Sequence, residues 1–373
     1  MKATKHPAHA IAAQELAELL AHREPITVLD VRDEVEGSIE APGLSSRHVA
    51  SSEVLADAGA VASGLSGRVA VVCNRGLTAT PVAEALRGQG VDAVVLEGGM
   101  RGWIGALQSH PVELGLEGVA VRQVQRPGRG CLSYLLAADG SALVVDPAPD
   151  ADYYLELAHG LGARITDVFD THLHADHLSG ARALGERTGA RLRLPASALE
   201  RGVADADRFL PVSDGETIDI GPLRLRAIAL PGHTTDMTGL VLDGHALIAG
   251  DSLFVDGIAR PDLQRSDPDG ARAMARVLHR TLHERVLSLG EDVLLLPCHT
   301  HPGVAPEAVF APLSEVAANV PELSIGDPEQ FAAAVVADMP PRPANYETII
   351  AVNAGTHPFD PELESGGNSC SSR

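Results

Sequence analysis

Short apolar runs alternate with amphipathic stretches along residues 10–108. ITVLD at residues 26–30 leads into a polar loop, and RVAVVC at residues 68–73 leads into a loop and a helical pattern. DAVVL at residues 92–96 leads into a glycine turn and a second helical pattern. Strands that alternate with helices need crossover connections, which favour a parallel sheet covered on both faces. The pattern predicts an α/β domain with a parallel sheet over residues 1–110.

A different order of elements follows a Pro- and Gly-containing segment, which we interpret as a linker over residues 111–117. Strand-like runs separated by glycine-containing turns come first, and helical patterns interleaved with strands come later. This order predicts a second domain over residues 118–359, with two sheets packed face to face and helices outside them. The polar, Gly- and Ser-rich residues 360–373 are predicted to be a disordered tail.

Composition narrows the function classes. The length of 373 residues suits about two domains, and the formal net charge of −21 argues against nucleic acid or an anionic membrane as a partner. No apolar run approaches the ~20 residues that span a bilayer. The first residues lack a signal-peptide pattern, and four scattered cysteines make no disulfide framework. We therefore expect a cytoplasmic protein.

One cysteine stands where a reactive thiol is often built. Cys73 ends an apolar strand, and Thr80-Pro81 is typical of a helix N-cap followed by proline at the first helical position. The intervening loop can aim backbone N–H groups at the sulfur, and these groups and the helix dipole favour a thiolate. A buried structural cysteine explains the same pattern, so both interpretations stay open at this point.

The segments VLDVRDEVEG, VVCNRGLTA and LEGGMRGW, in this order, resemble a rhodanese domain. In that family the cysteine that matches Cys73 carries a persulfide, so the resemblance implies sulfur carriage and sulfurtransferase chemistry. Two departures from the family pattern bear on whether this sulfur is transferred to cyanide or thiosulfate. Ser38 stands where such domains commonly have a histidine, and the loop after Cys73 lacks an arginine near its end.

Candidate metal ligands gather in THLHADHLSG at residues 171–180. His172, His174 and Asp176 occupy alternate positions, which project to the same side of an extended segment, and His177 follows them. Imidazoles and carboxylates together suit a borderline transition metal such as zinc or iron. Further candidates directly follow apolar strands, where α/β proteins build sites: His233, Asp251 and His299.

The motifs THLHADH, GHT, GDS and PCH, in this order, resemble the metallo-β-lactamase superfamily across roughly residues 118–355. The resemblance implies an αββα sandwich. Hydrolases of this superfamily bind two metal ions through seven residues, and all seven positions are filled here. One ion would be held by His172, His174 and His233, and the other by Asp176, His177 and His299, with Asp251 between them.

A segment after the third motif separates two branches of the superfamily. GIARPDLQ at residues 257–264 resembles a signature of persulfide dioxygenases, from which hydroxyacylglutathione hydrolases differ. In the dioxygenases a single Fe(II) is bound at the positions that match His172, His233 and Asp251. Two histidines and one carboxylate leave coordination positions open for oxygen chemistry.

The same resemblance assigns supporting roles. The remaining candidates would orient the ligands or the substrate: His174, Asp176, His177 and His299. Arg260 would contact the carboxylate of the thiol substrate, for which a guanidinium is well shaped, and a structural salt bridge with Asp262 is the alternative.

Together these features predict an enzyme with one Fe(II) per chain that converts a low-molecular-weight thiol persulfide, of glutathione or mycothiol type, and O₂ to sulfite and thiol. Cys73 would be its sulfur carrier, and a homodimer is compatible with the sequence. Two alternatives stay open. One is a thioester hydrolase of the hydroxyacylglutathione hydrolase type with two zinc ions, and the other is a non-catalytic sulfur carrier with a structural metal.

Overall fold

The computed structural model describes residues 9–35, 37–264, 267–337, 339–342 and 345–364. The chain forms two compact units. Unit 1 contains the described residues up to 108 together with residues 125–130 and 301–307, and unit 2 contains the remainder. Two short segments from the second half of the chain therefore belong to the N-terminal unit.

Unit 1 is built on a five-stranded parallel sheet in the order β1-β5-β4-β2-β3. Its strands are β1 (Ala10–Ile11), β2 (Ile26–Asp30), β3 (Ser45–His48), β4 (Arg68–Val72) and β5 (Asp92–Leu96). Its helices are α1 (Ala13–Ala21), α2 (Ser51–Ala56), α3 (Ala58–Ala62), α4 (Ala79–Gly88) and α5 (Gly99–Ile104).

The alternation of side chains along the strands explains why both faces of this sheet are covered. Val28 and Ala70 belong to a core that includes residues of α1 and α5. Their neighbours Leu29 and Val71 belong to a second core that includes residues of α2 and α4. Successive strand residues point to opposite faces, so one apolar run supplies both cores. The predicted parallel sheet is confirmed.

Unit 2 contains a seven-stranded sheet in the order β12-β11-β10-β9-β8-β7-β6 and a six-stranded sheet in the order β13-β14-β15-β16-β17-β18. The first comprises β6 (Gln108–Val112), β7 (Val119–Arg126), β8 (Cys131–Ala138), β9 (Ser141–Val145), β10 (Arg164–Phe169), β11 (Arg191–Pro195) and β12 (Phe209–Val212). The second comprises β13 (Thr217–Ile220), β14 (Leu223–Ala229), β15 (Thr238–Leu242), β16 (Ala246–Ile248), β17 (Leu294–Leu296) and β18 (Ala311–Pro312).

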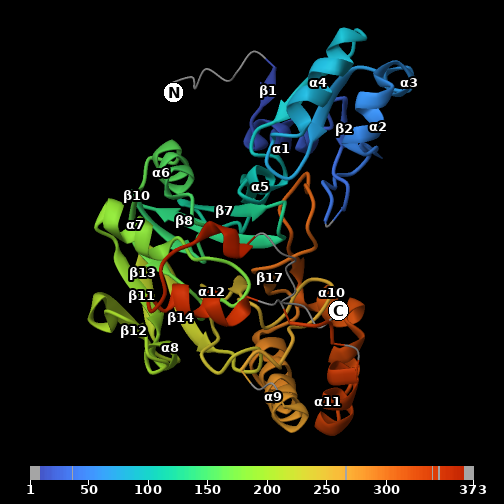
Figure 1. Cartoon of the computed structure of the whole chain (residues 1–373). Coiled ribbons are helices and arrows are strands. Elements are labelled where there is room, and N and C mark those ends of the chain that lie inside the picture. The colour runs from blue at the N-terminus through green and yellow to red at the C-terminus, as the bar shows by residue number, and fades with distance from the viewer. Residues whose placement is uncertain (1–8, 36, 265–266, 338, 343–344, 365–373) are drawn as a thin grey trace. The chain divides into compact units, whose positions relative to one another are not determined.

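Helices of unit 2 pack against both of its sheets. The α-helices are α6 (Ala151–Gly160), α7 (Ala181–Thr188), α8 (Ala196–Leu199), α9 (Pro268–Thr281), α10 (Leu313–Asn319), α11 (Pro328–Ala337) and α12 (Tyr346–Asn353). Helices α6 and α7 contact β10, and α9 and α11 lie side by side (Figure 1). Helix α12 packs against Leu178. Short turns of 3₁₀-helix are η1 (Ala206–Arg208), η3 (Leu287–Leu289), η4 (Pro321–Ser324) and η5 (Pro361–Glu364), and η2 (Leu282–Val286) is a π-helical turn.

The main core of unit 2 lies between the two sheets. Leu143 and Phe169 of the first sheet share one cluster with Leu225 and Leu240 of the second. A second cluster joins the other face of the six-stranded sheet, including Val241, to helices α9 and α11. Each sheet is thus apolar on both faces. The predicted αββα sandwich is confirmed.

Two segments differ from the predicted connections. Residues 111–112 of the predicted linker are the end of strand β6. The predicted tail begins with the 3₁₀ turn η5, because buried Glu364 accepts a hydrogen bond from the backbone N–H of Leu178 at 2.7 Å. Residues 365–373 lie outside the described residues. Among the described residues, no helix is long and apolar enough to cross a membrane.

Candidate metal centre

Strand topology brings the candidate ligands of unit 2 to one edge of the sandwich. The loop THLHADH follows β10, which pairs in parallel with β9. Asp251 and His299 follow β16 and β17, which also pair in parallel. His233 follows β14 after a Pro-Gly turn. Because parallel strands end at the same edge, residues that are distant in sequence meet there.

Three of the candidates form a compact donor set, which we call the triad: His172, His233 and Asp251. Nε2 of His172 and Nε2 of His233 each lie 3.7 Å from Oδ2 of Asp251. All three side chains are fully buried, and these three atoms form no hydrogen bond among the described residues.

The second nitrogen of each triad histidine is held by a neighbour. Nδ1 of His233 lies 2.9 Å from the carbonyl oxygen of Arg260, so Nδ1 carries the proton and Nε2 keeps its lone pair. Nδ1 of His172 lies 3.0 Å from Oγ1 of Thr171. Burial lowers the pKa of both histidines, and for His172 the pKa falls well below its usual range. Neutral rings that face a carboxylate oxygen, Oδ2 of Asp251, without a hydrogen-bond donor suit a divalent transition metal.

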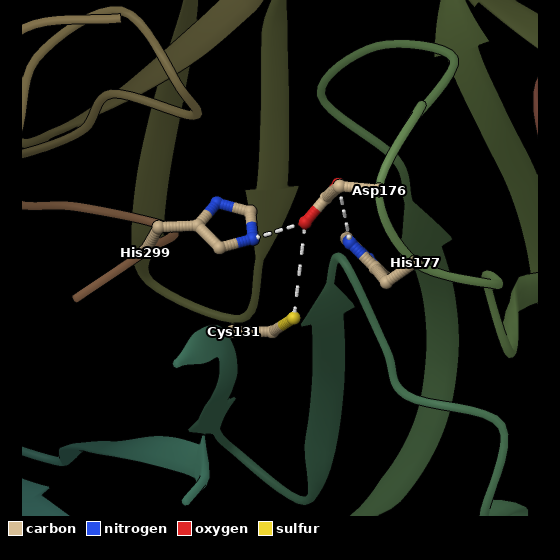
Figure 2. A group of neighbouring side chains, drawn as sticks. All are labelled: Cys131, Asp176, His177 and His299. Carbon is tan, nitrogen blue, oxygen red and sulfur yellow. Dashed lines mark hydrogen bonds and ion pairs between the residues drawn. The ribbon is translucent and has the colours of Figure 1, made fainter. Parts of the chain in front are cut away.

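Three further candidates are joined with Cys131 in a second set, the thiol set: Cys131, Asp176, His177 and His299 (Figure 2). One donor atom from each lies within 4.8 Å of the others. Oδ2 of Asp176 is 2.7 Å from Nε2 of His299 and 4.0 Å from Sγ of Cys131, and Oδ1 is 3.1 Å from Nδ1 of His177. The side chains of this set therefore contact one another.

Electrostatics within the thiol set favour charged forms. Burial alone would raise the pKa of Asp176, but the charges of His299 and His177 hold it well below its usual range. Burial alone would lower the pKa of His299, but the charges of Asp251 and Asp176 hold it well above its usual range. Burial would likewise raise the pKa of the Cys131 thiol, yet His177 and His299 bring it down to about 6.

Asp251 connects the two sets. Its Oδ2 faces the triad histidines, and its Oδ1 lies 2.6 Å from Nδ1 of His299. His174 lies apart from both sets, because its Nε2 is 3.0 Å from Oδ1 of Asp146. It forms a third group with Asp146 and Asp170.

The ligand loop is held from its C-terminal side. The side-chain amide of Asn353 donates to the carbonyl oxygens of His174 and His177 at 3.0 and 2.9 Å, and its oxygen accepts from the N–H of Ser179 at 2.9 Å. Oδ2 of Asp236 accepts from the N–H of Leu173 at 2.9 Å. The backbone of the loop is thus fixed by side chains from outside its own motif.

Arg260 is buried and fully engaged. Its guanidinium donates to both oxygens of Asp262, at 2.7 and 3.1 Å, and to the carbonyl oxygens of Pro340 and Pro341. The geometry matches the salt bridge that the sequence left as the alternative. Through its own carbonyl, Arg260 also fixes the ring of His233.

In unit 1, Cys73 lies in the loop between β4 and α4, and 4% of its surface is exposed. Its Sγ accepts a hydrogen bond from the N–H of Ala79 at 3.4 Å, so a loop amide does face the sulfur. The predicted N-cap at Thr80 is wrong, because α4 begins at Ala79 and the Thr80 hydroxyl donates instead to the carbonyl of Gly76 at 3.0 Å.

Comparisons with known proteins identify families for both parts of the chain. Family models match a rhodanese-like domain at residues 12–106 and the metallo-beta-lactamase superfamily at residues 126–299. The mitochondrial persulfide dioxygenase ETHE1 of Homo sapiens is 30% identical over 237 residues, which cover 59% of this chain and 88% of that protein. The chain belongs to the metallo-beta-lactamase superfamily.

Other members of the superfamily show different degrees of likeness. The crystal structure of ETHE1 from Myxococcus xanthus is 27% identical, with a TM-score of 0.55, and covers 64% of this chain and 99% of that one. A hydroxyacylglutathione hydrolase from Acidiphilium cryptum is 37% identical over 132 residues, which cover 34% of this chain and 51% of that protein. A metallo-beta-lactamase from Staphylococcus aureus is 22% identical, with a TM-score of 0.59 and coverage of 65% and 74%, which shows the fold alone.

Sequence reasoning missed three residues of this superfamily site: Cys131, Asp146 and Asp170. Asp146 and Asp170 directly follow the apolar strands β9 and β10, the same signal that identified Asp251. Cys131 begins β8, which runs antiparallel to β9. The start of an antiparallel strand lies at the same edge as the end of its neighbour, so attention to strand ends alone overlooked it.

Proposed function

We propose that this chain is an iron-dependent persulfide dioxygenase with a sulfurtransferase domain. The reaction is RSSH + O₂ + H₂O → RSH + SO₃²⁻ + 2 H⁺, where RSH is a low-molecular-weight thiol of the glutathione or mycothiol type. The triad would hold one Fe(II), and Cys73 would carry sulfur in unit 1. Similarity to ETHE1 proteins over most of their length supports this reaction class.

The observation that carries the proposal is the position of His299 between two carboxylates. Nδ1 is 2.6 Å from Oδ1 of Asp251, and Nε2 is 2.7 Å from Oδ2 of Asp176. Nδ1 hydrogen-bonds to Asp251, and the approach of Nε2 to Asp176 is favourable as an ion pair when both nitrogens carry protons. A doubly protonated His299 would have no lone pair for a second ion. The triad has its lone pairs available, and this favours a single metal.

Bound Fe(II) would supply the one-electron chemistry with O₂ that side chains lack. The protein's own groups have separate roles. His172 and His233 would present Nε2 as neutral donors, and Asp251 would add one negative charge. His299 holds a proton at Nε2 beside Asp176, from which it can be passed to the departing thiolate. Burial of these groups excludes bulk water from the reacting sulfur.

A second candidate function is thioester hydrolysis with two zinc ions. Buried Nδ1 of His174 and Nε2 of His177 form no hydrogen bond among the described residues, so two further nitrogens could turn to a metal once they are deprotonated. The similarity to hydroxyacylglutathione hydrolases points the same way over part of the chain. This function requires His299 to lose a proton and Asp176 to turn toward a metal.

Metal analysis and oxygen uptake on protein purified without O₂ distinguish the two functions. We expect one iron per chain, and O₂ uptake with glutathione persulfide that yields sulfite. His233→Ala and Asp251→Asn should lose both the metal and the uptake. His245→Ala, which alters an exposed histidine in a turn, is the matched control and should change neither. Two zinc ions per chain, with S-lactoylglutathione hydrolysis and no O₂ uptake, would refute the proposal.

A further inference from the structure

Cys131 is a thiol at the candidate centre that neither candidate function uses. Its Sγ lies 4.0 Å from Oδ2 of Asp176, the same oxygen that lies 2.7 Å from Nε2 of His299 (Figure 2). The backbones of Cys131 and His299 pair in an antiparallel bridge, and Leu132 donates to the carbonyl of Cys298 at 2.7 Å. The sulfur is therefore fixed by strand pairing beside the ligand loop.

The surroundings of this thiol are suited to receiving a reactant. Nε2 of His177 is buried and forms no hydrogen bond among the described residues. Cys131 is 7% exposed and His299 6%, whereas the other members of the triad and the thiol set are 2% exposed or less. Cys131 and His299 are therefore the least buried members of the two sets.

Cys298 differs from Cys131 and serves as a control thiol. Cys298 is fully buried, and its thiol donates to Oδ2 of Asp146 at 3.0 Å. Burial and the charges of Asp146 and Asp251 raise its pKa well above the usual value. Cys298 therefore keeps its proton and faces no solvent, whereas Cys131 lies beside His177, which can hold the proton of the thiol.

We propose that Cys131 is a second sulfur-accepting cysteine of this protein, which takes the outer sulfur of a low-molecular-weight persulfide and holds it beside the triad. The identity of the donor rests on the proposed function. The Cys131 sulfur attacks the outer sulfur of RSSH, a Cys131 S–S bond forms, and the bond between that sulfur and RS breaks. The thiol proton passes through a neighbouring imidazole to the leaving thiolate, which departs as RSH. No oxidant or reductant is consumed.

The position of Cys131 beside the candidate metal centre explains what this sulfur transfer would achieve. His299 joins the surroundings of the Cys131 sulfur to the triad, because its ring contacts Asp176 on one side and Asp251 on the other. A persulfide anchored on Cys131 adds one sulfur atom to a side chain whose position is already fixed. The reacting sulfur would then be held at high effective concentration, without capture of the small thiol itself.

The test is anaerobic labelling of the full, iron-loaded chain with glutathione persulfide, followed by alkylation that preserves persulfides and by peptide mass spectrometry. Without O₂ the sulfur cannot be oxidised onward. We expect about tenfold more added sulfur on Cys131 than on Cys298, because Cys131 is the less buried of the two and its sulfur lies beside His177, whereas the Cys298 thiol is fully buried and bonded to Asp146. The Cys131 label should persist in Cys73→Ser and Cys298→Ser and be absent in Cys131→Ser.

Several outcomes would overturn the inference. A label on Cys73 with none on Cys131 in the wild-type chain does so, and this measurement does not depend on how any variant folds. A second bound metal ion that is lost in Cys131→Ser also does so, because the sulfur is then a ligand. Labelled Cys131 without aerobic O₂ uptake would refute the proposed function and leave this inference standing, and normal uptake with unlabelled Cys131 would do the reverse.

Discussion

Asn353 offers the sharpest test of how the ligand loop is held in place. It lies at the end of α12, about 175 residues beyond the loop, and makes three hydrogen bonds to backbone groups of His174, His177 and Ser179. Asn353→Ala removes all three and leaves two carbonyls and one N–H without these partners. The substitution touches no candidate ligand.

The size of the effect follows from those bonds. A net contribution of about 1 kcal/mol for each gives about 3 kcal/mol. Because Asn353 is only half-buried, water can replace part of the loss, and we expect the free energy of unfolding to fall by about 2–3 kcal/mol. Metal affinity should fall about 10- to 100-fold, as it does when groups that orient metal ligands are removed.

Urea denaturation of the metal-free chain, followed by circular dichroism, measures the first effect, and metal titration measures the second. Hydrogen exchange should show faster exchange in residues 171–180. Asn353→Asp keeps the acceptor for Ser179 and places an oxygen against two carbonyls, so it should be at least as harmful. Asn319→Ala, at the exposed end of α10, is the matched control. An Asn353→Ala chain that unfolds within about 0.5 kcal/mol of wild type and has unchanged metal affinity would refute this reasoning.

Three further predictions concern other features. Gly99→Ala should destabilise the chain by about 3 kcal/mol or more and reduce persulfide loading of Cys73. The reason is that Gly99 has a φ of +59° and that the new Cβ would lie 2.0 Å from the Cys73 carbonyl oxygen. Gly88→Ala, which has open space around it, is the control and should be neutral in the same urea and labelling assays. Asp262 has a pKa below its usual value, because the hydrogen bonds and charge of Arg260 outweigh the effect of burial. The stability that this carboxylate adds is therefore present above about pH 4 and is lost as the pH falls through its lowered folded-state pKa. Acid unfolding curves of Asp262→Asn should lack this part of the pH dependence, and equal slopes in the variant and the wild type would contradict the assignment. Removal of the metal by a chelator should lower the midpoint of thermal unfolding, since binding to the folded state alone stabilises it, and an unchanged midpoint in calorimetry would argue against a resident ion.

The fold could be predicted from the sequence because its short apolar runs fit buried strands. Runs such as VAVV at residues 69–72 are apolar at every position, as a strand covered on both faces must be, and the alternation with helices favoured the parallel order. The assignment of residues 125–130 and 301–307 to unit 1 has no local signal. It depends on contacts between segments far apart in the chain.

The candidate ligands could be predicted because each follows an apolar strand, but their grouping could not. His174 belongs to a third group because Asp146 lies 3.0 Å away, and Asp146 comes from another strand. Arg260 likewise shows its role only when Asp262 and the carbonyls of two prolines are seen around it. Residue type and spacing name the possible donors, and the three-dimensional partners decide which atoms are available.

His233 and His299 illustrate how the partners of a histidine ring decide which of its nitrogen atoms is available. Both follow a strand of the six-stranded sheet, and both match ligand positions of two-metal hydrolases. His233 has a backbone carbonyl at Nδ1, which can only accept, so its proton is fixed there and Nε2 is free for a metal. His299 has carboxylates at both nitrogens, so in the proposed single-metal site the ring would keep both protons and serve as a cation between Asp251 and Asp176. In that proposed site the metal number thus depends on which oxygens lie behind the histidines.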